Sequence, residues 1–449
     1  MIKEFVSIEG INFVIDNKPF KIKGVSLGSY LNLEHFMIKL PGIESNIRKA
    51  IIEIYGRENA LNFWQNFVEC FFTEEDASFL REIGVNTIRL PFNYHHFLSD
   101  DGVDIEEGFN LIERVLKICE RNDIYVILDL HAAIGGQNPD WHSDNPCGES
   151  LFWRYLDFQE KTISLWKRIA ERFKNRASII GYDVLNEPVI EDRKISGIIV
   201  NNFYKKVISA IREVDKNHII FLEGDFYATD TSRFEVPEDP LVAYSIHFYP
   251  FFHVEKQREG YRKMNRSERK EFLKEILKKT SIDDIQKRLK RPVWCGETGV
   301  PHKEEISNVL EELLDETLEV LEELNISWSI WTYKDAKSMG MIYCGEDTPW
   351  MKLSKELLRD WRFLRDFNFF EEKAKEYVRG ILPEITPSTE LIRKIMFRLL
   401  SMNDLIMVEK LKLFLKDIPF DKFYSYPESF LFKNCNKWER LVKVIKRWL

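Results

Sequence analysis

The chain has 449 residues, enough for about three domains at roughly 150 residues each. Hydrophobic residues make up 44% and aromatic residues 13%, which is ample for a large core and excludes a disordered chain. The formal charge of −8 argues against nucleic acid as a partner. No apolar run approaches the roughly 18 residues that span a bilayer, so we expect no membrane partner.

The cysteines and the N-terminus suggest a compartment. None of the six cysteines forms a C-x-x-C pair, so neither a zinc cluster nor a dense disulfide framework is indicated. Residues 1–20 alternate apolar and polar side chains, and no basic stretch is followed by an apolar core. This pattern predicts a β-hairpin instead of a signal peptide, and we expect a cytoplasmic location.

Eight apolar, strand-like runs recur along the chain, mostly separated by amphipathic stretches with helical periodicity. They lie at 21–27, 86–92, 124–131, 179–188, 218–225, 241–250, 292–300 and 326–335. Continuous apolar runs are typical of strands buried on both faces, and strand–helix alternation indicates a parallel sheet. Eight such units, each ending in polar or aromatic residues, predict an α/β fold of the (β/α)8 TIM-barrel class.

Segments beyond this minimum predict additions to the barrel. We assign 1–374 to the barrel, with an N-terminal hairpin, a helical insertion at 28–72 after the first strand and a charged helical insertion at 251–291. Residues 375–449 have helical periodicity after a Pro-flanked start and predict a C-terminal helical extension. The extension could brace the barrel or form a contact in a homo-oligomer.

Two glutamates stand at strand ends. Glu187 lies in LNEP after the fourth run, and Glu297 lies in GETG in the seventh. The ends of these two strands face each other across a barrel mouth. A pair of carboxylates there suits glycoside hydrolysis, in which one protonates the leaving oxygen and the other attacks the anomeric carbon.

With these motifs the chain resembles glycoside hydrolase family 5, the cellulase-type retaining enzymes, over roughly residues 18–350. The resemblance implies that Glu187 is the general acid/base and Glu297 the nucleophile. It further implies a role at the sugar site for Arg89 in IRLPF, His131 in DLH, Asn186 beside Glu187, His247 and Tyr249 in HFY, and Trp331 in SIWTYKD.

Each implied role has a physical reason. A fixed cation at Arg89 favours the anionic form of Glu297. Glu187 must first carry a proton, so its surroundings should lack such a cation and raise its pKa. Asn186 can donate a hydrogen bond to the sugar 2-hydroxyl, and Trp331 offers a flat apolar face to the pyranose ring.

Weaker candidates lie in the loops after the second and third runs. Asn138 and Trp141 stand in a polar, Gly-rich loop, and His95 follows the second run, so each is a candidate for binding substrate. Lys334 and Asp335 either reach the substrate or pair with each other. Glu223 ends the fifth run, where we expect it to support the catalytic residues.

The substrate expected is a β-linked glucan or oligosaccharide, with a β-mannanase or β-mannosidase as the alternative on the same residues. A non-catalytic carbohydrate-binding barrel is a further alternative, although both carboxylates are present. Gly24–Gly28 matches the G-x-S-x-G of esterases, but only a hairpin precedes it. The first run has no histidine pair, and the chain has no H-E-x-x-H helix, Walker loop or G-x-G-x-x-G, so we expect no metal and no cofactor.

Overall fold

The fold is that of a computed structural model, which describes residues 2, 4–99, 104–192, 194–359 and 367–449. At its centre eight parallel strands close into a barrel in the order β10-β11-β4-β5-β6-β7-β8-β9. The strands are β4 (Lys23–Ser26), β5 (Thr87–Asn93), β6 (Tyr125–Ala132), β7 (Ile179–Asp183), β8 (Ile219–Glu223), β9 (Val242–His247), β10 (Val293–Thr298) and β11 (Ser327–Ile330). Each lies inside one of the eight runs or extends at most one residue beyond it, so the predicted (β/α)8 barrel is confirmed.

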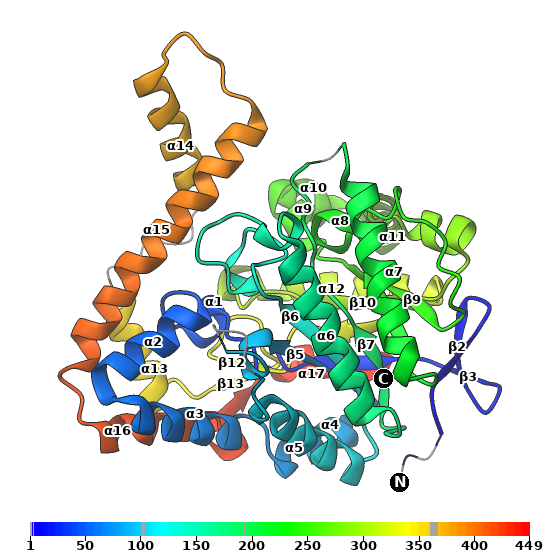
Figure 1. Cartoon of the computed structure of the whole chain (residues 1–449), viewed down its shortest axis with the longest axis horizontal. Helices are drawn as coiled ribbons and strands as arrows, with labels where there is room; N and C mark the ends of the chain where they lie inside the picture. Colours follow the sequence, from blue (N-terminus) through cyan, green and yellow to red (C-terminus); the bar gives the residue numbers. More distant parts are fainter. Residues whose placement is uncertain (1, 3, 100–103, 193, 360–366) are drawn as a thin grey trace.

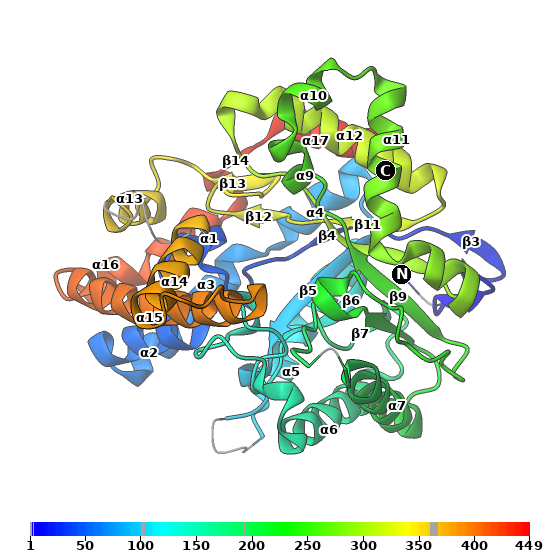
Figure 2. The same ribbon diagram turned by 90° about the horizontal axis from the view of Figure 1, so that it is seen from above.

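Helices cover the outside of the barrel, as the strand–helix alternation predicts (Figure 2). They are α4 (Glu74–Ile83), α5 (Glu107–Arg121), α6 (Leu156–Phe173), α7 (Ser196–Val214), α8 (Asp225–Ala228) and α12 (Ser307–Glu323). The strands are almost entirely buried because the helices cover one face and the barrel interior the other. The apolar faces of the strands and helices merge into one large core.

Local sequence sets the ends of α4. The Thr73 side chain and Asp76 form a reciprocal capping box at its start, with the Thr73 N–H donating to Asp76 Oδ2 at 2.8 Å. Gly84 ends the helix with a φ of 107°, a left-handed conformation that glycine adopts without a Cβ penalty. The chain therefore passes after a short turn from α4 into β5, the strand that contains Arg89.

The N-terminal hairpin is present and is extended by a third short strand. Strands β1 (Ser7–Glu9), β2 (Asn12–Ile15) and β3 (Lys18–Phe20) form an antiparallel sheet in that order. Val6 and Phe13 pack in one apolar cluster with barrel residues such as Ile127 and Trp294. Because this cluster lies toward the amino ends of the strands, the N-terminal sheet closes that end of the barrel and leaves the carboxyl ends for a site.

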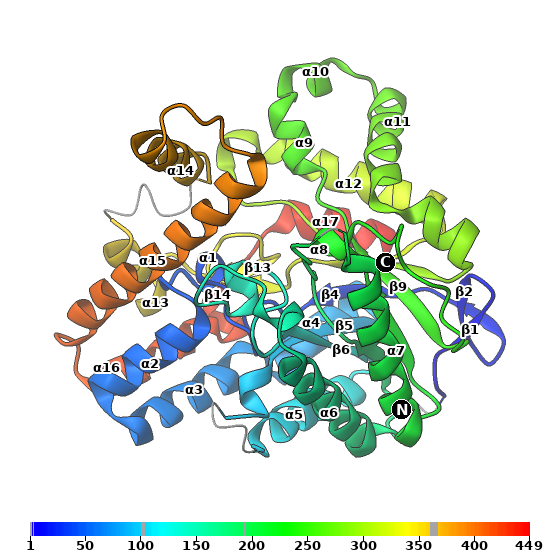
Figure 3. The same cartoon turned by 45° about the horizontal axis from the view of Figure 1, so that its top comes forward.

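Two insertions stand on different sides of the barrel (Figure 3). The 28–72 insertion forms α1 (His35–Ile38), α2 (Glu44–Tyr55) and α3 (Arg57–Phe71). The 251–291 insertion forms α9 (Phe251–Lys256), α10 (Arg258–Lys263) and α11 (Arg266–Leu277), followed by short turns of helix at Lys278–Thr280 and Asp284–Leu289. Its charged residues pair with α12, as in the Lys270–Glu319 contact of 2.7 Å, so the charge run is mainly a solvated helix face.

The C-terminal part begins as a helical hairpin beside the barrel (Figure 1). After α13 (Pro349–Leu357) come α14 (Phe367–Ile381) and α15 (Thr389–Leu415), which pack against each other around a small apolar cluster of their own. The boundary drawn at 374/375 falls inside α14. Helix α15 also packs along α2 of the first insertion, and the Tyr55 hydroxyl donates to the Leu415 carbonyl at 2.9 Å.

The chain then returns to the barrel. Helix α16 (Phe420–Tyr424) leads to β14 (Cys435–Lys437), which pairs with β13 (Ile342–Cys344) beside β12 (Lys334–Asp335), and α17 (Glu439–Trp448) packs on α12. Within the described ranges, no helix is long and apolar enough to cross a membrane. All six cysteines are free of disulfide bonds.

Lys334 anchors this returning segment instead of reaching substrate. Its Nζ lies 2.5 Å from Asp76 Oδ1 and donates to the carbonyls of Phe71 and Phe430, and the side chain is fully buried. Asp335 accepts three backbone N–H bonds, from residues 338–340. The sequence-based alternatives for Lys334 and Asp335, a substrate contact or a mutual pair, are therefore both wrong.

Replacing Lys334 by Met should lower the free energy of unfolding by about 3 kcal/mol, because the buried Asp76 loses its counter-charge. Lys337→Met is the matched control, since Lys337 pairs with Glu304 and Glu346 at the surface and its loss should cost under about 1 kcal/mol. Urea unfolding of the two variants measures the difference. Equal stability losses would contradict the anchoring role.

Candidate active site

The two glutamates lie together at the carboxyl ends of the strands. Glu297 is in β10, and Glu187 follows the end of β7. A carboxylate oxygen of each lies within 4.8 Å of the other, with a nitrogen of His247 inside the same limit. Two carboxyl groups this close suit a direct attack on a sugar held between them better than activation of a water in a wider gap.

Glu187 is held in an uncommon backbone conformation. Its φ of 46° lies in the left-handed region, which residues other than glycine seldom adopt. The Glu187 N–H donates to Glu223 Oε2 at 2.6 Å, and the Glu187 carbonyl accepts from Asn138 Nδ2 at 3.0 Å. These two bonds fix the strained turn, so Glu223 has the supporting position expected for it.

Glu297 accepts a hydrogen bond on each carboxylate oxygen. Arg89 Nη1 donates to Oε1 at 2.5 Å, and the Tyr249 hydroxyl donates to Oε2 at 2.7 Å. The Tyr249 hydroxyl stays protonated, because burial and the charge of Glu297 raise its pKa well above the ordinary value. Because each oxygen has a donor, the orientation of the Glu297 carboxylate is fixed.

Arg89 is surrounded by more acids than the sequence indicated. Its guanidinium is fully buried and lies 3.1 Å from Asp129, 3.1 Å from Asp183 and 3.3 Å from Glu223, besides Glu297. Burial and the Glu223 charge raise the pKa of Asp183 well above its ordinary value. Asp129 and Asp183 were missed; the strand-end positions of both acids, in DLH and DVLNEP, were the available signal.

Two histidines contact Glu187 and change its expected titration. His247 Nδ1 lies 2.7 Å from Oε1, and His142 Nε2 lies 3.1 Å from Oε2. Burial alone would raise the pKa of Glu187, but the hydrogen bonds and charges of the two histidines outweigh it and hold that pKa well below its usual range. The expectation that this site lacks a cation and raises the pKa of Glu187 is therefore wrong.

The same histidine affects Glu297 and its neighbours. Burial raises the pKa of Glu297, while the charges of His247 and Arg89 act in the opposite direction. Burial disfavours charge on His247, but Glu223 and Glu297 outweigh it and raise the His247 pKa well above the ordinary value. His247 therefore stands between the two catalytic candidates, with Nδ1 2.7 Å from Glu187 Oε1 and 3.5 Å from Glu297 Oε2.

His131, Trp331 and Asn186 form the floor of the mouth. The rings of His131 and Trp331 stack with centroids 5.2 Å apart and an interplanar angle of 7°. Asn186 Oδ1 accepts from Arg89 Nη2 at 2.8 Å, and its amide nitrogen lies 3.5 Å from His131 Nε2. The six residues implied by resemblance besides the glutamates therefore gather around the same space.

The loop candidates have different positions. Asn138 is fully buried, and its amide bonds the Glu187 carbonyl and His142 Nε2, so it positions the acid instead of facing solvent. Trp141 packs edge-on against His35 of the first insertion, with centroids 5.0 Å apart. His142, in the same polar loop, contacts Glu187 directly, with Nε2 3.1 Å from Oε2.

His95 joins a clasp between three segments. Its Nε2 lies 3.2 Å from Glu44 Oε1, and its Nδ1 lies 3.6 Å from Asp144 Oδ2. Glu44, His95 and His96 are close enough together to hold a metal ion. However, Glu44 Oε1 already accepts from Arg48 at 2.7 Å, and His96 Nε2 bonds the Leu31 carbonyl at 3.1 Å. These partners favour a structural clasp over a metal centre.

The esterase alternative lacks its geometry. Ser26 lies inside strand β4, not at a strand-to-helix turn, and is fully buried. Its hydroxyl has no hydrogen-bond partner among the described residues, so no base can activate it.

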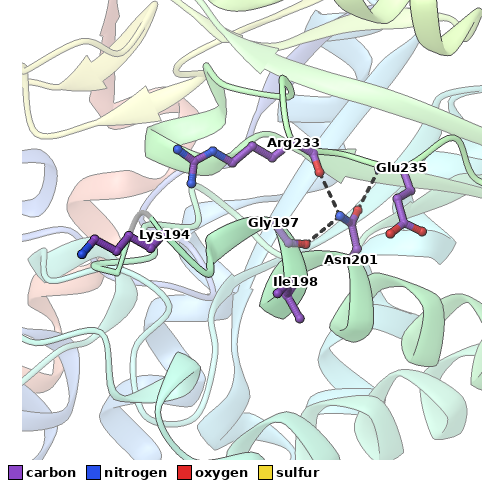
Figure 4. A pocket seen from close by; sticks show the side chains of 6 residues that line it. All are labelled: Lys194, Gly197, Ile198, Asn201, Arg233 and Glu235. Atoms are coloured by element: carbon purple, nitrogen blue, oxygen red, sulfur yellow. Dashed lines mark hydrogen bonds between the residues drawn. The ribbon is translucent and has the colours of Figure 1, made fainter.

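A surface hollow at the start of α7 is separate from this site (Figure 4). Lys194, Gly197, Ile198, Asn201, Arg233 and Glu235 line it. The Asn201 amide bonds the carbonyls of Gly197 and Arg233, and its oxygen accepts from the Glu235 N–H. Because the Asn201 side chain bonds backbone groups of α7 and of the 233–235 segment, it joins these two segments and offers no catalytic group.

A parallel barrel with two close glutamates, a buried arginine and an aromatic floor at the carboxyl ends defines a glycoside-hydrolase type of barrel. The cellulase model of glycosyl hydrolase family 5 matches residues 45–337, and the chain belongs to that family. It is therefore a glycoside hydrolase, as the sequence predicts.

Individual relatives agree with this assignment. A protein named beta-xylosidase from Phanerodontia chrysosporium is 35% identical, over 79% of this chain and 76% of its own length. Endoglucanase C of Acetivibrio thermocellus is 26% identical, over 61% of this chain and 87% of its own. The crystal structure of endoglucanase Cel5A from Thermotoga maritima has the same fold, with a TM-score of 0.51, 18% identity and coverage of 71% of this chain and 91% of that one.

Removing the contact of His142 should shift the pH dependence of the acid. In His142→Gln, the pKa of Glu187 rises, because a charge and a hydrogen bond that favour its anion are lost. With Glu187 as the acid that the sequence analysis expects, activity is lost as pH rises through that pKa, so the basic limb of kcat/KM should move up by about one pH unit.

A pH–rate profile on an aryl β-glycoside measures this shift. His302→Gln is the control, since His302 lies beside Trp438 away from the glutamates and should leave the limb in place. A basic limb that stays or moves down in His142→Gln would refute the coupling.

Proposed function

We propose that the protein is a retaining β-glycosidase that hydrolyses β-linked gluco-configured oligosaccharides through a glycosyl-enzyme on Glu297. The observation that carries the proposal is the closeness of the two carboxylates, with oxygens within 4.8 Å. Retaining enzymes keep their carboxyl groups about 5–5.5 Å apart, whereas inverting enzymes leave room for a water between them. A pair this close therefore favours double displacement.

In the first step, Glu297 attacks the anomeric carbon while Glu187 gives a proton to the leaving oxygen. Arg89 and Tyr249 orient Glu297 and hold its unreactive electron pairs. Once the ester forms, the charge of Glu297 is gone, and Glu187 becomes a base. Glu187 then takes a proton from water, which attacks the same carbon and releases the sugar with its configuration retained.

Glu187 and its histidines act as a proton-sharing group in this scheme. His247 and His142 lie within hydrogen-bond distance of its two oxygens. A proton held by this group reaches the Glu187 carboxyl when the leaving group needs it and returns there when water is activated. His247 also contacts Glu223, which in turn holds the Glu187 N–H, so the turn and the proton are positioned together.

Glucose, xylose and mannose are the candidate sugars for the substrate. The expected gluco-configured substrate agrees with the endoglucanase relative, whereas the relative with 35% identity carries the name beta-xylosidase. Xylose and glucose share the arrangement of their ring hydroxyls and differ in the CH2OH group, so both fit one catalytic set. A β-mannoside remains the alternative that the sequence analysis named.

The assay for the catalytic roles uses Glu187→Gln and Glu297→Gln on β-linked gluco-, xylo- and manno-oligosaccharides. We expect kcat/KM to fall by at least about 100-fold in each, because a group needed in the transition state is lost. Glu305→Gln, an exposed carboxylate on the same barrel, is the matched control and should keep full activity. Full activity in either glutamate variant would overturn the proposal.

Double displacement has its own signature. A 2-deoxy-2-fluoro glycoside with an activated leaving group should label the wild-type chain once, on Glu297, as seen by mass spectrometry of peptides. Proton NMR should show the β-anomer of the sugar first. Initial formation of the α-anomer would establish inversion and refute the glycosyl-enzyme.

A further inference from the structure

One buried carboxylate near the mouth has no role in the scheme above. Glu34 lies eight residues after the end of β4, just before helix α1, and only 5% of it is exposed. Its Oε1 makes no hydrogen bond among the described residues, and its partner in the mouth is His131 Nε2, which lies 3.5 Å away. Because a buried carboxylate oxygen with only this long contact is poorly satisfied, it can accept a further hydrogen bond from a donor that arrives from outside the protein.

Glu34 faces the same space as the catalytic groups. Its Oε1 lies 3.5 Å from His131 Nε2, beside the stacked pair of His131 and Trp331. This contact with the stacked pair places Glu34 at the border of the position expected for the reacting sugar.

The chemistry of the site defines the missing donor. An ionised carboxylate only accepts hydrogen bonds, and its two oxygens can accept from two neighbouring donors at once. Adjacent hydroxyls of a pyranose ring are such a pair. His131 cannot supply both bonds, because Asp129 Oδ2 holds its Nδ1 at 2.7 Å.

The segment that carries Glu34 also walls one side of the mouth. Asn32 Nδ2 donates to the His142 carbonyl at 3.0 Å, and the His35 ring meets Trp141. At Gly28 the chain passes so near Trp331 that an added Cβ would lie 2.9 Å from the indole ring. The insertion and the loop after β6 are thus joined into a continuous wall beside the sugar site.

This wall continues beyond Glu34. The Ser45 N–H donates to Asp144 Oδ1 at 2.9 Å, and Asn93 Nδ2 donates to Asp144 Oδ2 at 3.1 Å. These bonds tie the insertion to the ends of β5 and to the loop after β6. Hydrogen bonds to β5 and to the loop after β6 therefore hold this wall in place beside the sugar site.

From these contacts we infer that Glu34 binds hydroxyls of the terminal, non-reducing sugar and makes the enzyme exo-acting, so that it releases single sugars. The inference rests on the glycosidase function proposed above and extends it to the direction of attack and to the residue that selects the chain end.

Deoxy substrates test the contact directly. For aryl β-xylosides or β-glucosides that lack the 3- or 4-hydroxyl, wild-type kcat/KM should fall by about 10- to 100-fold for at least one of them, because a bond to a charged acceptor is lost. In Glu34→Ala the same deletion should cost under about threefold, since its partner is already gone. Equal penalties in wild type and variant would overturn the inference.

Two further variants separate binding from folding. Glu34→Gln keeps the size of the side chain and should retain part of the discrimination between full and deoxy substrates. Glu58→Ala, an exposed carboxylate in the same insertion, should discriminate like wild type. Thermal unfolding of each variant is measured alongside, and the ratio of the two kcat/KM values is independent of how much enzyme is folded.

The products test the direction of attack. With oligosaccharides of four to six units, wild type should release only monosaccharide at early times, and a methyl cap on the non-reducing 4-hydroxyl should block cleavage. Early disaccharides or trisaccharides would refute exo-action. If wild type hydrolyses aryl glycosides and is labelled on Glu297, a failure here concerns Glu34 alone; if the label is absent, the proposed function itself fails.

Discussion

The buried guanidinium of Arg89 is the charge on which the arrangement of the site depends. It comes from β5, and it meets acids from β6, β7, β8 and β10, namely Asp129, Asp183, Glu223 and Glu297. Four carboxylates at this distance would repel one another, and the Arg89 cation between them offsets that repulsion. The strand ends are therefore joined by electrostatics as well as by backbone pairing.

The same network positions Glu297 and Glu187 relative to the barrel strands. Arg89 aims Glu297 and holds Asn186, while Glu223 holds the backbone of Glu187 and one nitrogen of His247. The remaining nitrogen of His247 reaches the Glu187 carboxyl. The proposed acid/base and the proposed nucleophile are thus the two ends of one hydrogen-bonded system.

The additions to the barrel give the mouth its shape. The N-terminal sheet occupies the amino end, so chemistry is confined to the other. The first insertion supplies Glu34 and His35, and the loop after β6 supplies Trp141 and His142. Helix α15 supports the insertion through α2, which connects the C-terminal hairpin to the wall of the site.

Much of this was predictable from sequence. Eight apolar runs determined the barrel because burial on both faces demands continuous hydrophobic strands, and LNEP and GETG at run ends located Glu187 and Glu297. Capping by Thr73 and Asp76 was likewise readable locally. By contrast, Lys334 was misjudged because its partner, Asp76, lies far away in the chain.

The sequence by itself determined the class of fold and located the two candidate carboxylates, since both depend on local pattern. Only the tertiary structure decided their electrostatics: His142 and Glu34 reach the mouth from segments whose spacing says nothing of where they fold. The pKa of Glu187 is lowered, not raised, for this reason. Electrostatic interactions depend on distance in space and on burial, and a sequence pattern specifies neither for residues in loops.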